Sequence, residues 1–63
     1  MRQSESVPFL VGTKIVVFWP SNKKWYKGVV NDVDQTDDTF EVHYLVDDKY
    51  IWHDQTWKTK LLE

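Results

Sequence analysis

The chain contains no cysteine, and its 63 residues include only two histidines, two glycines and two prolines. The lack of cysteine excludes disulfides, thiolate metal sites and a cysteine nucleophile. His43 and His53 are too few for a histidine-rich metal site. No apolar run approaches the roughly 18 residues of a membrane-spanning helix, and no apolar segment typical of a signal peptide follows the first residues. We therefore expect a soluble chain without metal, cofactor or membrane contact.

Neither sign of charge predominates, because the formal net charge is only -2. The basic residues are dispersed along the sequence, apart from the adjacent Lys23 and Lys24 and the pair Lys58 and Lys60. Strong binding to nucleic-acid phosphates requires a basic footprint, and the sequence shows none. The small negative charge instead favours a basic partner.

Aromatic residues, by contrast, are abundant: the chain has four tryptophans, three tyrosines and three phenylalanines. A domain of this size is small and only marginally stable, and its core needs only a few large side chains. Some of the rings are therefore available for another role. Aromatic side chains at a surface hold a cation or a flat apolar group.

Short β-type segments fill the chain after Gly12. The expected strands cover residues 13–19, 25–33, 39–45 and 50–53, with a short closing strand at 60–62. Gly28 inside the second segment predicts a bulge or a sharp bend. Residues 54–58 are expected to form a single helical turn capped by Asp54 or Thr56. The predicted fold is all-β: a small five-stranded antiparallel barrel with a short helical turn near the C-terminus. Residues 1–9 are expected to be a disordered tail and residues 10–63 the barrel.

The alternation of side chains along the strands separates core from rim. Antiparallel neighbours bring the end of one strand beside the start of the next, so Trp19 should meet Tyr26, and Tyr44 should meet Tyr50. These four rings are predicted to surround one open end of the barrel. The expected packing residues are Val16, Phe18, Val29, Phe40, Val42 and Leu61, with Trp52 and Trp57 closing the barrel.

Three segments resemble a Tudor domain: VGTKIVVFWP at residues 11–20, KWYKGVV at 24–30, and VHY at 42–44. The acidic pair Asp47 and Asp48 and a tryptophan at position 57 add to the resemblance, which covers about residues 10–62. Lys49 stands where the family usually has glycine after the acidic pair.

The resemblance implies an SH3-like barrel that binds methylated lysine or arginine in an aromatic cage. It assigns the cage to Trp19, Tyr26, Tyr44 and Tyr50, with Asp47 or Asp48 as its acidic member. The expected partner is a methylated histone tail or similar basic peptide. The expected setting is nuclear, as a monomeric module within a larger chromatin protein.

Three other readings stay open at this stage. A Tudor domain can read methylated arginine, whose flat guanidinium stacks between parallel rings. A barrel with surface tryptophan and tyrosine can bind nucleic acid, if only weakly here. A barrel with a degenerate cage can serve as a protein-interaction module. Catalysis is not expected, because His53 and Asp54 have no nucleophile beside them in the pattern.

Overall fold

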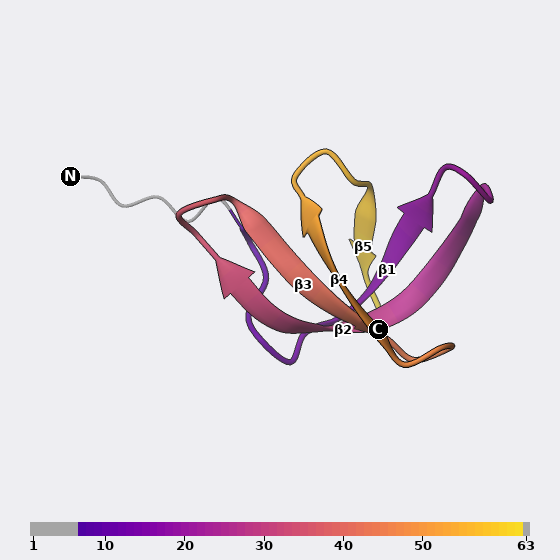
Figure 1. The fold of residues 1–63 in the computed structure, drawn as a ribbon, viewed down its shortest axis with the longest axis horizontal. Helices are drawn as coiled ribbons and strands as arrows, with labels where there is room; N and C mark the ends of the chain where they lie inside the picture. The colour runs from indigo at the N-terminus through magenta and orange to yellow at the C-terminus, as the bar shows by residue number, and fades with distance from the viewer. Residues whose placement is uncertain (1–6, 63) are drawn as a thin grey trace.

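The computed structural model describes residues 7–62, which form five antiparallel strands in one strongly bent sheet (Figure 1). The strands are β1 (Lys14–Trp19), β2 (Lys24–Asp34), β3 (Thr39–Tyr44), β4 (Lys49–Asp54) and β5 (Thr59–Leu61), and their order in the sheet is β4-β3-β2-β1-β5. A link of only four residues joins the two edge strands, β4 and β5, so the sheet must curl to bring its edges together. The predicted all-β, five-stranded antiparallel class is confirmed.

The link between β4 and β5 is a single hydrogen-bonded turn. Trp57 N donates to Asp54 O over 3.5 Å, and Asp54 Oδ1 accepts from Thr56 N at 2.9 Å. Residues 7–62 contain no helix, and hence none that is long and apolar enough to cross a membrane. The expected helical turn is therefore wrong as a helix. Asp54 caps the turn, and β5 begins at Thr59, which leaves only four residues for the link.

Each of the three hairpin turns ends on a residue with left-handed backbone. These residues are Lys23, Asp38 and Asp48, with φ angles of 57°, 61° and 60°, and each lies directly before the next strand. Aspartate tolerates this conformation better than most residues. Asp48 thus takes the left-handed position of the β3–β4 turn, and Lys49 begins β4 without any need for glycine.

The inner face of the sheet forms the hydrophobic core. Its buried side chains from the strands are Ile15, Val17, Val30, Phe40, Val42 and Tyr44. The predictions for Phe40 and Val42 are confirmed. They are wrong for Val16, Phe18 and Val29, which alternate with these positions and so lie on the outer face.

Of three further packing predictions, two are wrong and one agrees with the structure. Leu61 lies in the edge strand β5 and is 63% exposed, and Trp52 lies on the outer face of β4 and is 47% exposed. Both predictions are wrong, because nothing described covers these positions. Trp57 packs against the core as expected, with its ring centroid 4.8 Å from that of Trp19.

The barrel begins earlier in the sequence than position 10. Val7 is 1% exposed and belongs to the core. Its backbone N and O pair with the side-chain amide of Gln35, each at 3.0 Å. Phe9 packs edge-on against Phe40 at 5.3 Å. Val7 and Phe9, within the segment expected to be a tail, thus pack with the core, while residues 1–6 lie outside the described part of the chain.

Gly28 and the bulge in β2 are separate features. The register between β2 and β3 shifts between Val30 and Asp32, so the bulge lies three residues beyond Gly28. Gly28 instead permits close approach of β3: a Cβ atom at this position would lie 2.4 Å from a methyl carbon of Val42 and 3.0 Å from the carbonyl oxygen of His43. The glycine is needed for strand packing and not for a bend in its own backbone.

A chain of hydrogen bonds crosses the core from β1 to β4. Trp19 Nε1 donates to the Tyr44 hydroxyl at 3.1 Å, and this hydroxyl lies 2.7 Å from His53 Nε2. His53 is 2% exposed and is surrounded by the rings of Trp19, Phe40 and Trp57. Three strands are thereby joined through side chains as well as through the sheet.

The hydrogen-bond directions follow from the burial of these groups. The buried Tyr44 proton needs an acceptor, which His53 Nε2 supplies when the neutral imidazole carries its proton on Nδ1. Burial raises the pKa of Tyr44 to about 12. Burial lowers the pKa of His53 to about 4, although the nearby Asp54 carboxylate acts in the opposite direction. Both side chains are therefore neutral at pH 7.

The Gly28→Ala variant should be less stable by about 1–3 kcal/mol, because the added methyl group overpacks the β2–β3 contact. Lys27→Ala, on the exposed outer face next to it, should change the stability by less than about 0.5 kcal/mol. Urea unfolding of both variants measures the difference. Equal midpoints for Gly28→Ala and Lys27→Ala would contradict the close packing at this position.

Stability should fall as the pH is lowered from about 6.5 to about 4. The folded-state pKa of His53 is depressed below its ordinary value of 6.5, so the unfolded chain takes up a proton in this range and the folded chain does not. The contribution is complete above pH 6.5 and is lost on acidification, with a slope of up to about 1.4 kcal/mol per pH unit.

Urea midpoints measured across this range, for the wild type and for His53→Gln, test the expectation. His53→Gln should flatten the dependence. An NMR titration of the wild-type imidazoles gives an independent reading. A His53 midpoint near 6.5 would contradict the assignment.

Candidate functional site

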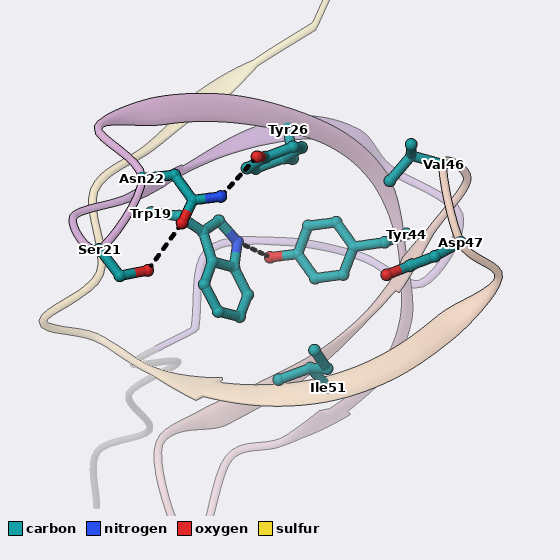
Figure 2. A pocket seen from close by; sticks show the side chains of 8 residues that line it. All are labelled: Trp19, Ser21, Asn22, Tyr26, Tyr44, Val46, Asp47 and Ile51. Atoms are coloured by element: carbon teal, nitrogen blue, oxygen red, sulfur yellow. Dashed lines mark hydrogen bonds between the residues drawn. The ribbon is translucent and has the colours of Figure 1, made fainter.

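A cavity of about 300 Å³ opens at one end of the barrel, between the β1–β2 turn and the β3–β4 turn (Figure 2). Its lining combines three aromatic rings, two aliphatic side chains and three polar side chains: Trp19, Tyr26, Tyr44, Val46, Ile51, Ser21, Asn22 and Asp47. Four strands and both turns contribute, so the site exists only in the folded barrel.

The β1–β2 hairpin supplies one side of the cavity. Its register pairs Trp19 with Lys24 and Val17 with Tyr26, which places Trp19 and Tyr26 on the inner face near the strand ends. Asn22 Nδ2 donates to the Tyr26 hydroxyl at 2.8 Å. The turn thereby restrains the outer edge of this ring, as Figure 2 shows.

Trp19 and Tyr44 form an adjoining wall. Their ring centroids lie 5.7 Å apart at an interplanar angle of 73°, and the hydrogen bond between them fixes this arrangement. Tyr44 is only 3% exposed, so it serves mainly as a buried support, while Trp19 is half-buried. The two rings meet nearly at a right angle and leave no parallel slot between them.

Asp47 provides negative charge at the rim. It lies in the β3–β4 turn, where its Oδ1 accepts from Lys49 N at 3.3 Å. Its carboxylate also helps to raise the pKa of Tyr44, after the larger effect of burial. A carboxylate beside aromatic rings gives the cavity two means of attracting a cation.

Two residues predicted for the site lie elsewhere, on the outer face of the sheet. Tyr50 stacks on His43, with ring centroids 4.3 Å apart and an interplanar angle of 3°. Asp48 Oδ1 lies 2.5 Å from His43 Nε2. The β3–β4 register pairs Tyr44 with Lys49, so Tyr50 falls on the opposite face from the cavity.

The sequence interpretation did not identify the other four lining residues, nor the buried histidine beneath them. Ile51 and His53 occupy the inner positions of β4, and strict alternation from Lys49 would have placed them there. Val46, Ser21 and Asn22 come from turns, whose side-chain directions no periodic pattern reveals. In the sequence, His53 is distinguished only by its position next to Asp54.

The chemistry of the lining suits an organic cation with a weak hydration shell. Aromatic faces attract such a cation through their quadrupole, and the aliphatic side chains accept its apolar surface. Among residues 7–62, no three histidine, aspartate or glutamate side chains come together as a metal-binding group.

Comparison with known proteins identifies the family of the chain. No family model and no curated protein matches the chain. It is similar to a solved structure described as the "crystal structure of Arabidopsis RDM15 tudor domain in complex with an H3K4me1 peptide". The two share 32% sequence identity over 97% of this chain and 100% of that chain, with a TM-score of 0.76. With this identity over nearly its whole length, the chain belongs to the Tudor domain family.

Proposed function

We propose that this Tudor domain binds methylated lysine in a histone tail or a similar basic peptide. The observation that carries the proposal is the gathering of Trp19, Tyr26, Tyr44 and Asp47 around one cavity. The similar RDM15 domain is in complex with an H3K4me1 peptide, which supports the same ligand class for this chain.

Methylation changes the lysine side chain in the way that this cavity favours. A methylated ammonium keeps its positive charge, loses hydrogen-bond donors and becomes easier to remove from water. Each well-placed ring contributes about 0.5–2 kcal/mol to its binding. Unmethylated lysine is more strongly hydrated, so an aromatic lining selects against it.

Asp47 favours the lower methylation states. Mono- and dimethyl-lysine retain an N–H, which a carboxylate can accept as a charge-assisted hydrogen bond. Trimethyl-lysine has no N–H and offers only its diffuse charge. Monomethylation of the peptide in the RDM15 complex is in keeping with this preference.

The ring geometry favours lysine over arginine. A flat methylated guanidinium is best held between parallel rings, whereas Trp19 and Tyr44 meet at 73°. The parallel pair, His43 and Tyr50, lies on the outer face, away from the cavity. A compact methylammonium suits walls that meet at an angle.

This function defines a binding module without catalysis, which would recruit a larger nuclear protein to a methylated mark on chromatin. The RDM15 relative is bound to a histone peptide, which supports a chromatin setting. One cavity in one barrel is sufficient for one methylated side chain, so the proposal requires only a monomer.

Tyr26→Ala should weaken the binding of an H3K4me1 peptide about tenfold, corresponding to the loss of about 1–2 kcal/mol from one ring. Tyr26 is better suited to this test than Tyr44, whose removal would leave buried Trp19 and His53 groups without partners. Isothermal titration calorimetry measures the affinity, and circular dichroism checks the fold.

Tyr50→Ala is the matched control, because it removes the same side chain from the outer face. It should leave the affinity unchanged. Equal losses for Tyr26→Ala and Tyr50→Ala, or tight binding of the unmethylated peptide, would contradict the proposed site.

Asp47→Asn should weaken mono- and dimethyl-lysine peptides more than the trimethyl peptide, because only the lower states lose a hydrogen bond to a carboxylate. Asp48→Asn makes the same change in net charge on the other face and should affect all three states little. Parallel titrations of the three peptides with both variants test this. A trimethyl preference that neither substitution alters would show that Asp47 is only a turn residue.

A further inference from the structure

Four lysines gather on the outer face of β1, β2 and β5, on the opposite side of the sheet from the core. Val16 in the middle strand pairs with Lys27 on one side and with Lys60 on the other. Lys14 lies two residues before Val16 on the same face. Lys58 precedes β5, where its backbone carbonyl accepts from Phe18 N at 2.9 Å. We call this surface, made of Lys14, Lys27, Lys58 and Lys60, the basic face.

The basic face contains no opposing charge of its own. β1, β5 and the segment 24–30 of β2 include no aspartate or glutamate. The acidic residues of the described chain lie in the remainder of β2, in β3, in the last residue of β4 and in the β2–β3 and β3–β4 turns. Among residues 7–62, the close contact between a basic nitrogen and a carboxylate oxygen joins His43 and Asp48, and no lysine forms one. A chain with net charge -2 therefore presents a locally positive surface.

Two aromatic rings hold part of this charge in place. The Lys60 ammonium lies 4.7 Å from the centre of the Trp25 ring, and the Lys58 ammonium lies 5.9 Å from that of Phe18. Phe18 and Trp25 are cross-strand neighbours with ring centroids 5.3 Å apart. Such contacts restrain the lysines without neutralising them.

We propose that the basic face binds the phosphate backbone of duplex DNA, as a second site distinct from the cavity. Adjacent strands lie about 4.8 Å apart, so Lys27 and Lys60 are separated by about 10 Å across the sheet. Over that length a duplex presents about six phosphate charges. The face matches a continuous line of negative charge and reads no sequence.

The aromatic residues favour a duplex over a single strand. Binding to single strands depends on bases stacking on free aromatic faces, whereas lysine ammonium groups already lie over Trp25 and Phe18. A protein partner would use these two rings as anchors, and the same lysines lie in the way. Phosphate contacts need only the ammonium groups, which remain accessible.

The test is fluorescence anisotropy of a labelled duplex of about 20 base pairs, titrated with the domain at several salt concentrations. Four phosphate contacts predict a slope of about −3 to −4 in a plot of log affinity against log salt. The variant Lys27→Gln with Lys60→Gln should bind roughly tenfold more weakly at about 50 mM salt and reduce the slope to about −2.

A charge-matched control distinguishes the effect of the basic face from the effect of net charge alone. Lys49→Gln with Thr36→Glu also lowers the net charge by two, at positions away from the basic face, and should retain most of the binding. Tyr26→Ala should bind DNA like the wild type, so the DNA result does not depend on the methyl-lysine result. Circular dichroism confirms that each variant is folded.

Several results would overturn the proposal. These are equal losses in the two charge variants, no duplex binding at low salt, tighter binding of a single strand than of the duplex, or equally tight binding of a poly-glutamate peptide. Tighter binding of a single strand would indicate that bases stack on Trp25. Equally tight binding of the poly-glutamate peptide would indicate that the face binds acidic proteins.

Discussion

The hydrogen-bonded chain from Trp19 through Tyr44 to His53 is the constraint on which the site depends. It joins β1, β3 and β4 beneath the cavity and fixes the angle between two of the cavity rings. Each member satisfies a polar atom of its neighbour away from water, so removing one leaves the next unpaired at a cost of about 1–3 kcal/mol. The cavity therefore rests on a polar network inside an otherwise apolar core, and this network fixes the positions of Trp19 and Tyr44.

The bent sheet separates two kinds of cation chemistry. The open end of the barrel combines aromatic rings with Asp47, and we propose that it attracts a positive side chain. The outer face of β1, β2 and β5 presents lysines, two of them over aromatic rings. The same attraction between rings and cations applies to both surfaces. In the cavity the protein supplies only the rings, whereas on the outer face it supplies the lysine cations as well. The two proposed ligands, a basic peptide and a DNA duplex, would therefore occupy different surfaces of the domain.

Much of the fold and part of the site could be predicted from local pattern. Alternation and turn residues indicated the five strands, and strand ends indicated Trp19, Tyr26 and Tyr44. The face on which Tyr50 lies could not be predicted, because it depends on the length of the β3–β4 turn, which pairs Tyr44 with Lys49. The burial of Val7 and the packing of Phe9 could not be predicted either, because they depend on contacts with Gln35 and Phe40, far along the chain.

The sequence by itself determined the fold class, because strand propensity and period-two alternation are local properties of the chain. It also determined that aromatic rings exceed what the core requires. Only the tertiary structure decided which rings share a cavity, that Asp47 and not Asp48 lies at its rim, and that His53 is buried beneath it. It also brought together four lysines that are dispersed in the sequence. The physical reason is that cross-strand register and sheet curvature are set by long-range pairing, and a shift of one residue moves every side chain to the opposite face.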